Sequence, residues 1–327
     1  NFQLAGSTKM AVRGDGNVYI GSSGSNGLIN LNRSSDGVTV GTMGLSSTNV
    51  LDLSVSGGST PLIQSIIGGT TIMKLDGNSR ISLSNNDSGT SNTVLGYGSG
   101  VNLDAGSNEN VFIGHQASGN GTNNDSLYNV GIGFKSLFDL AGGDGNTAIG
   151  HKALFNVDEG QFNVSIGKGS LQNLTSGSSN VAIGTDALGT PTTAEDIVAI
   201  GRGTAYAVNN DTADGTVAVG RSALASLTSG SGNLSVGRSS GLNVTTGADN
   251  VGVGEKTIGG NSSTAITGDA NTAVGWSAGS NLEGAAANNT LIGKNSGYAM
   301  TTGTYNVLVG ARCGDALVDG DYNVFLG

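Results

Sequence analysis

The sequence has little of what stabilises an ordinary globular domain. Of its 327 residues only 36% are hydrophobic and 5% aromatic, whereas 58 are Gly. A single core of ordinary size would need more apolar side chains, so burial must be local and repeated. Low hydrophobicity can indicate disorder, but Val, Ile and Leu recur here at fixed intervals, which a disordered chain does not show.

Positive charge and cysteine are also scarce. Fourteen Lys and Arg face 24 Asp and Glu, and the net charge of −10 argues against a nucleic-acid partner, because cations supply most of the affinity for phosphates. The one cysteine, Cys313, excludes an intrachain disulfide. No window approaches the roughly 20 apolar residues that span a bilayer, so we expect no membrane insertion. No motif for a cofactor is visible.

A five-residue motif recurs fourteen times between residues 92 and 327. It consists of Asn, a mostly β-branched residue, a small or apolar residue, Ile, Val or Leu, and a Gly that we call the coil glycine, and twelve of the fourteen copies begin with Asn. The commonest step between coil glycines is 17 residues, and longer steps carry extra polar residues, as insertions in one loop of a stacked coil would. The pattern predicts an all-β fold, a parallel β-roll or β-solenoid of about fourteen 17-residue coils.

The motif around residue 180 shows how one coil should be built. On a strand Val181 and Ile183 point to one side, whereas Asn180, Ala182 and Gly184 point to the other, so that one face can line a narrow core. Equivalent residues of stacked coils then form Val and Ile columns and an Asn ladder. The third residue after the coil glycine is always small, as at Ala187, and Cys313 is expected to be one more small filler in that column. Each coil buries few apolar atoms, so we expect stability to come from stacking and from association with identical chains.

Two further columns predict the rest of the coil. Seven residues after the coil glycine the side chain is apolar in ten of thirteen coils, often with Leu three residues earlier, a spacing that favours a helical or 3₁₀ turn. Most Asn residues are preceded by Gly-x-x, as in Gly177 to Asn180, and this Gly is expected to supply positive φ at a corner.

Residues 1–91 do not follow the repeat. Segments 9–21, 27–41 and 70–84 alternate apolar and polar residues around an Asp-Gly pair, which is typical of β-hairpins. We therefore expect a β-hairpin-rich region at 1–91 and a β-solenoid at 92–327.

The Asn-Val-Ala-Ile-Gly motif followed by a small residue resembles the head repeats of trimeric autotransporter adhesins of the YadA type. A further resemblance, carried by KMAVRGDGNVYIG and MKLDGNSRISLSNND before the repeats, is to bacteriophage tail fibres and related virion appendages. These resemblances imply an intertwined homotrimer on a virion or a cell surface. In the phage family an endosialidase-type intramolecular chaperone often follows and is cleaved off, so the end at Gly327 fits a mature fibre or a fragment.

Few residues suggest chemistry. His115 and His151 both follow a coil glycine and lie two coils apart, roughly 10 Å, too far to share a metal ion. Asp158 and Glu159 form a carboxylate pair in a corner, where solvated acids are common, and nothing places a partner with a raised pKa beside them. We expect no catalytic, cofactor or metal site.

A ladder of three arginines is the candidate recognition surface. Arg202, Arg221 and Arg238 each follow a coil glycine and would stack at intervals of about 5 Å. Such close cations need partners. Two interpretations remain open, namely salt bridges to loop acids such as Glu195 and Asp196, within or between chains, and an acidic glycan bound along the ladder.

The leading hypothesis is therefore a structural fibre without enzymatic activity, a phage tail fibre shaft or receptor-binding appendage that attaches to a host-surface glycan or receptor and to other virion proteins. The first alternative is a bacterial trimeric adhesin head. A depolymerase fibre would need a cleft rich in aromatics and acids, and an ice-binding solenoid would need a regular Thr column. The sequence shows neither feature.

Overall fold

The computed structural model describes residues 91–121, 125–208 and 211–327, together with the backbone of nine strands in the first ninety residues. The chain divides into two compact units, Asn1–Asn86 and Asp87–Gly327, which we describe separately. The larger unit confirms the predicted all-β parallel solenoid.

The first unit contains three antiparallel sheets of three strands each. They are formed by β1 (Phe2–Gln3), β2 (Thr8–Val12) and β3 (Val18–Ser22), by β4 (Leu28–Asn32), β5 (Thr39–Leu45) and β6 (Leu51–Ser54), and by β7 (Ile63–Ile67), β8 (Thr70–Leu75) and β9 (Ile81–Ser82). Each predicted hairpin is one strand pair, namely β2 with β3, β4 with β5, and β8 with β9. The Asp-Gly turns lie outside the described residues.

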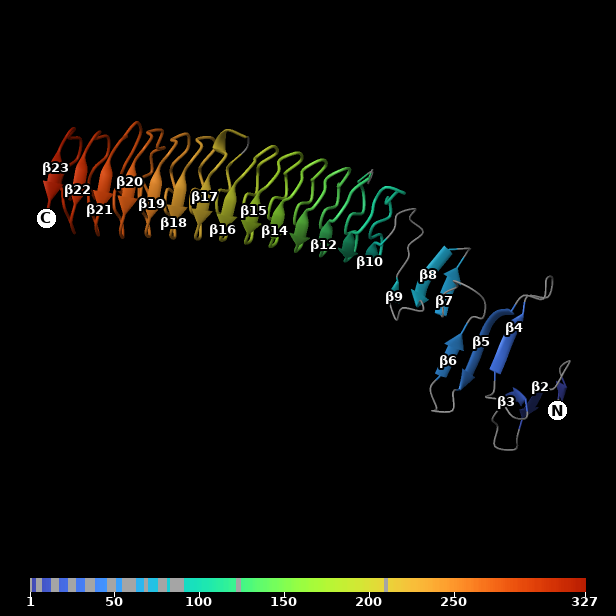
Figure 1. Cartoon of the computed structure of the whole chain (residues 1–327). Helices are drawn as coiled ribbons and strands as arrows, with labels where there is room; N and C mark the ends of the chain where they lie inside the picture. The colour runs from blue at the N-terminus through green and yellow to red at the C-terminus, as the bar shows by residue number, and fades with distance from the viewer. Residues whose placement is uncertain are drawn as a thin grey trace. The chain divides into compact units, whose positions relative to one another are not determined.

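The second unit is one parallel sheet of fourteen short strands, stacked in sequence order (Figure 1). The strands are β10 (Thr93–Leu95), β11 (Val111–Ile113), β12 (Val130–Ile132), β13 (Thr147–Ile149), β14 (Val164–Ile166), β15 (Val181–Ile183), β16 (Val198–Ile200), β17 (Val217–Val219), β18 (Leu234–Val236), β19 (Val251–Val253), β20 (Thr272–Val274), β21 (Thr290–Ile292), β22 (Val307–Val309) and β23 (Val324–Leu326). Each strand is the three central residues of one motif.

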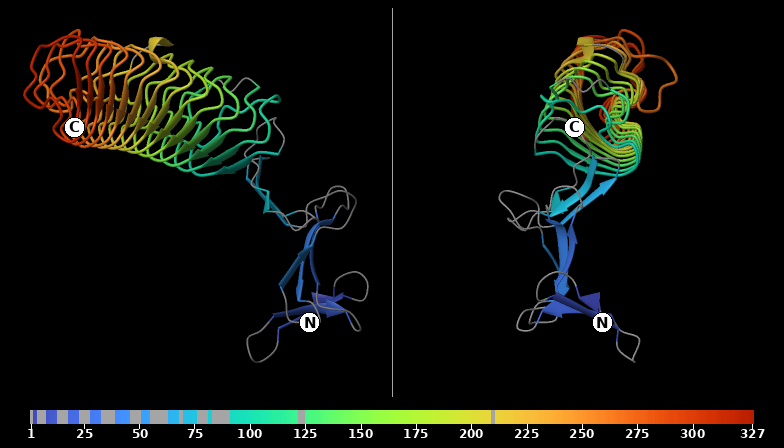
Figure 2. Two further views of the ribbon diagram at one scale, coloured as in Figure 1. Left: turned by 60° about the vertical axis from the view of Figure 1, so that its left-hand side comes forward. Right: turned by 90° about the vertical axis from the view of Figure 1, so that its right-hand side faces the viewer.

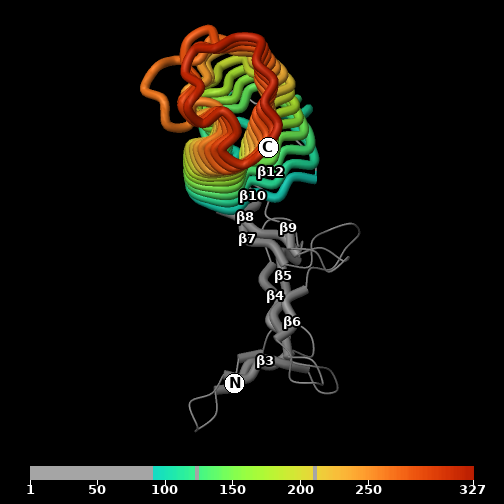
Figure 3. Tube along the Cα trace, turned by 90° about the vertical axis from the view of Figure 1, so that its left-hand side faces the viewer, coloured from blue at the N-terminus to red at the C-terminus, as the bar shows by residue number. Residues whose placement is uncertain are grey.

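Every coil follows its neighbour in register, so equivalent motif residues lie above one another, as Val181 pairs with Val198 and Ile183 with Ile200. Figures 2 and 3 show the coils as a stack of similar turns. The loop in orange that projects furthest in Figure 3 belongs to the part of the chain where the longest step, from Gly254 to Gly275, inserts extra residues. The insertion leaves the register of β19 and β20 intact.

The two faces of the sheet differ in a way that the motif alone did not settle. The central residue of each strand points into the coil, and Ala148, Ala182 and Ala199 are fully buried. The residues on either side of it point outward, and Ile149 and Ile200 remain 37% and 36% exposed. The central residue, which is small in nine of the fourteen strands and Val, Phe or Leu in the others, therefore lines the interior with the Asn. The Val and Ile columns form the outer surface.

The Asn ladder is present and buried. Asn163 accepts a hydrogen bond at Oδ1 from the backbone N–H of Asn180 (3.0 Å) and donates from Nδ2 to Oδ1 of Asn146 (3.1 Å) and to the carbonyl of Gly177 (2.9 Å). The amide thus satisfies backbone groups of the adjoining coils, which have no other partner inside so narrow a core.

Two adjacent coils interrupt the ladder. Ile197 and Thr216 replace Asn, and both are buried. Ile197 still donates its N–H to Oδ1 of Asn180 (3.1 Å), but its own side chain offers nothing to the next coil. The hydroxyl Oγ1 of Thr216 is buried without a hydrogen-bond partner.

The limb after the strand is a pair of turns, and the expected helical or 3₁₀ conformation is wrong there. In the coil of β12 the N–H of Leu140 donates to the carbonyl of Leu137 (3.3 Å), and both side chains are fully buried, so the prediction that they share a face is confirmed. However, φ is positive at Lys135 and Leu137. The second and fourth positions after the coil glycine have positive φ in all thirteen coils where they occur, which alternates the chain direction without a helix.

The slot of small residues is confirmed, and it closes the interior beside these turns. Ala187 is fully buried and Cys313 is 8% exposed. The one described 3₁₀ helix, η1 (Asp211–Ala213), lies in a loop instead of the turn limb.

Glycine serves mainly to let coils approach one another. Gly184 has φ +135°, and a Cβ there would lie 2.5 Å from the carbonyl oxygen of Gly201 in the next coil. The Gly of Gly-x-x-Asn also allows close approach of the next coil, because a Cβ on Gly177 would lie 2.0 Å from the carbonyl oxygen of Ala194. The prediction that Gly177 supplies positive φ is wrong, since the positive φ falls on Ser179, directly before the Asn.

Candidate functional surfaces

The outward face of the solenoid sheet is an apolar surface that runs over all fourteen strands. Its two outward positions on each strand hold Val, Ile or Leu, and the exceptions are four threonines, Thr93, Thr147, Thr272 and Thr290. None of these positions is charged. Because the strands are hydrogen-bonded in one sheet, the aliphatic side chains form a continuous apolar strip, which we call the outer strip. Monomeric soluble proteins rarely expose an apolar patch that extends over fourteen strands.

The residue after each coil glycine forms an exposed column beside this strip. In the first four coils its side chains are rings, and Tyr97, His115, Phe134 and His151 stack in that order at centroid distances of 5.4, 5.3 and 5.1 Å. Ring faces are therefore covered by neighbouring rings, and mostly edges face the solvent. Phe134 lies between the two histidines.

A second ring stack lies on the turn limb next to the first. Phe138 and Phe155 are stacked with centroids 4.9 Å apart. The ammonium of Lys135 lies 4.4 Å from the ring centroid of Phe138, a cation–π contact. Sequence analysis missed this stack, although both phenylalanines occupy the fifth position after a coil glycine, in successive coils.

The arginine ladder lies further along the same column. Arg202, Arg221 and Arg238 are exposed, and Arg238 forms a salt bridge with Glu255, the equivalent residue of the next coil. Among the described residues Arg202 and Arg221 have no ion-pair partner. Glu195 and Asp196, which sequence analysis suggested as partners, lie before β16, whereas Arg202 lies after it. The N–H of Glu195 donates to a carboxylate oxygen of Asp214 in the next coil (3.3 Å).

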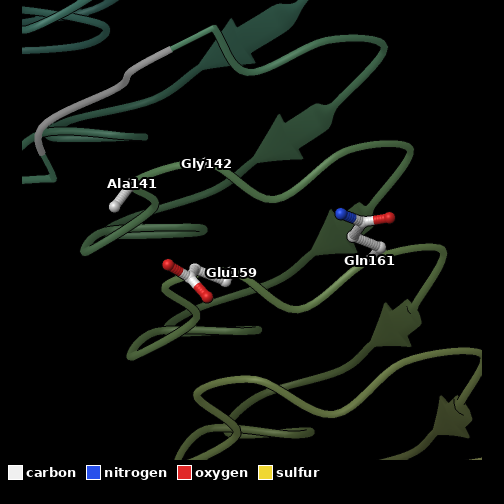
Figure 4. Close-up of a pocket in the computed structure, with 4 residues that line it drawn as sticks. All are labelled: Ala141, Gly142, Glu159 and Gln161. Atoms are coloured by element: carbon white, nitrogen blue, oxygen red, sulfur yellow. The ribbon is translucent and has the colours of Figure 1, made fainter.

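A small pocket lies between two successive coils on the turn side (Figure 4). It is lined by Ala141, Gly142, Glu159 and Gln161. Glu159 supplies the one carboxylate among these four residues, and Asp158 is not part of the lining. Glycoside hydrolysis ordinarily needs two carboxylates on either side of the scissile bond, so this lining does not assemble that machinery.

Among the described residues, the carboxyl of Asp104 has a pKa that departs from its usual value. Burial acts to raise the pKa of Asp104, but hydrogen bonds from the Ser107 hydroxyl and from the N–H groups of Asp125, Ser107 and Gly106 outweigh it and lower the pKa below its usual value. Oδ1 of Asp104 accepts from the Ser107 hydroxyl at 2.8 Å and from the N–H of Asp125 in the next coil at 3.2 Å. The shift stems from bonds that hold two loops together, not from a charged partner.

The described part of the chain contains no group of three or more His, Cys, Asp or Glu that could hold a metal ion. Nor does it contain a helix long and apolar enough to cross a membrane. No family model, curated protein or solved structure matches the chain. The fold is that of a β-solenoid repeat protein, consistent with a structural or adhesive fibre.

Proposed function

We propose that the chain is a structural fibre protein, the shaft of a phage tail fibre or receptor-binding appendage, and that it assembles as a homotrimer through the outer strip. The strip is the observation that carries the proposal. It presents unpaired aliphatic side chains such as Ile149, Ile200 and Ile292, which are 36 to 39% exposed, along the whole stack. Covering them removes apolar surface from water.

The dimensions of the strip suit an interface. At about 4.8 Å per coil it extends over roughly 65 Å, and two columns of side chains give it a width of roughly 10 Å. Its area of about 650 Å² is close to the roughly 800 Å² per partner of a stable interface, before the flanking corners are counted. The trimeric state itself rests on the resemblance to YadA-type heads.

In this proposal, stacking of coils holds one chain together, and contact between outer strips holds the chains to one another. The inward face is closed by the central strand residues and the Asn ladder, and buried leucines such as Leu137 and Leu154 fill the interior beside them. A rod with such a core serves as a stiff spacer, and contact with a host glycan or receptor falls to its corners and longer loops. The protein acts by binding, without catalysis, on a virion; the same architecture would serve a bacterial adhesin head.

The test is the mass and the shape of the purified chain. We expect light scattering to give three times the mass of one chain and electron microscopy to show rods. A monomer, or a globular outline, would contradict the proposal. Incubation with host polysaccharide should release no sugar, because the proposal includes no hydrolase, and immunogold labelling should place the protein on virions.

A further inference from the structure

The cations of the solenoid lie at one border of the outer strip, and eight of its acids lie at the other border. Every Lys and Arg of residues 92–327 occupies the first or second position after a coil glycine, at the border where the strands end. We call these positions the basic edge. It also carries two acids, Asp186 and Glu255.

The opposite border is acidic. The two positions before each ladder Asn, or before its equivalents Ile197 and Thr216, contain eight Asp or Glu and no Lys or Arg. We call these positions the acidic edge. Several of its carboxylates are fixed by the stack, as Asp269 accepts the N–H of Ala248 (2.7 Å) and Asp321 the N–H of Thr304 (2.7 Å) in the preceding coil.

The two edges of one chain cannot neutralise each other within a coil. Arg202 and Asp196 are both exposed but stand at opposite ends of β16, roughly 15 to 20 Å apart at about 3.3 Å per residue. Arg221 and Asp214 are separated in the same way by β17. A cation at one end and a carboxylate at the other therefore recur at equal height along the rod.

This arrangement distinguishes between the ways in which two copies can associate. When two rods run parallel and are related by rotation about an axis along the rod, the basic edge of each copy meets the acidic edge of the next. When the rods run antiparallel, face to face, basic edge meets basic edge and acidic meets acidic. Like charges at contact distance disfavour that arrangement, whereas opposite charges favour the parallel one.

We propose that the edges set the direction and register of assembly, so that copies associate parallel and in register with Arg202 and Arg221 facing Glu195, Asp196 and Asp214 of the neighbouring copy. The inference rests on the proposed association through the outer strip. The strip supplies apolar contact without direction along the rod, and the edges supply the direction. Arg202 and Arg221 are the cations for which this matters most, since Arg238 already has Glu255 as a partner.

The test uses charge reversal on one edge and then on both. The variant R202E/R221E should assemble at least about tenfold more weakly than the parent chain in light scattering over a dilution series, because acids then face acids. The variant E195K/D196K should weaken assembly similarly. A chain with these four changes and D214K should regain most of the loss, because each reversed cation then faces a reversed acid. The variant R202K/R221K should assemble like the parent because it keeps the charge.

A disulfide trap reports direction separately. In a C313A background, R202C combined with D196C should give chains linked to one another under mild oxidation, since the two sites are too far apart within one chain to bond. The parent mass measured in the same series separates the two ideas, because a monomeric parent chain would overturn the proposed function. If the parent is a trimer, any of three results would overturn only the edge inference. These are single-edge variants that assemble as well as the parent, a fully reversed variant (R202E/R221E/E195K/D196K/D214K) that shows no rescue, or no linked chains in the disulfide trap.

Discussion

The two faces of the solenoid sheet are made by the same three-residue strands, yet they follow opposite rules. On the inward face most side chains are buried, and the central strand residue, small in most coils, lies beside an amide that satisfies the backbone of adjoining coils. On the outward face large β-branched side chains are left partly exposed. The inward face thus stabilises the stack of one chain, whereas the outward face is the surface through which we propose that further chains assemble.

The coil glycine should be the most sensitive point of the inward side. Replacing Gly184 with Val places a Cβ 2.5 Å from the Gly201 carbonyl oxygen at a φ of +135°, so we expect a loss of about 3 kcal/mol or more in the free energy of unfolding, measured by urea denaturation. Gly203 is the matched control, because its φ is +62° and a Cβ added there would meet no atom within 4 Å. G203A should cost about 1 kcal/mol. Equal losses in both variants would refute the close-approach explanation.

The Asn ladder should come next. N163L leaves the N–H of Asn180 and the carbonyl of Gly177 buried without their partner, and each such group costs about 1 to 3 kcal/mol. We expect a total loss of about 3 kcal/mol by the same denaturation assay. T216V removes a buried hydroxyl that has no partner and should leave stability unchanged or raise it. If T216V is as damaging as N163L, the ladder is not the source of the stability.

A smaller effect should follow acidification. The folded pKa of Asp104 is lowered, so its hydrogen bonds stabilise the fold fully above the ordinary pKa of an Asp and lose that contribution as the pH falls through the folded value. The D104N variant should flatten the stability curve in that acidic range relative to the parent chain. Parallel curves for the two proteins would show that Asp104 does not supply this dependence.

The outward face should matter least to the fold of one chain. In I183K the change is at a partly exposed outward position, so circular dichroism should still report the parent β-signal, whereas light scattering should show a shift to single chains. The inward counterpart A182K should lose the β-signal, because Ala182 is fully buried. An I183K chain that still assembles like its parent would show that the outer strip is not the surface through which the chains associate.

Periodicity was enough to predict most of the fold, because the strand, the coil glycine and the small slot of Ala187 recur without exception. It could not decide which face of Val181–Ile183 pointed inward, since alternation on a strand fixes only that neighbours differ. The turn limb was predicted wrongly because positive φ at residues such as Leu137 is uncommon and depends on the stack to hold it.

The candidate surfaces were predictable to a lesser degree. The exposed positions of Arg202, Arg221 and Arg238 followed from their column, but the partner of Arg238 depended on how long side chains lie between adjacent coils. The outer strip was hidden for a different reason. Its residues have the composition of a core, and only the structure shows that the central residue of each strand, and not its two neighbours, points into the coil.

The most direct test of the central claim is the mass of the assembled chain before and after its outer strip is made polar. We predict that light scattering gives three chains for the parent protein and one chain for a variant in which Val181, Ile183, Val198 and Ile200 are all Lys, with the parent β-signal retained in circular dichroism. A parent protein that is monomeric, with the strip exposed in solution, would contradict the account.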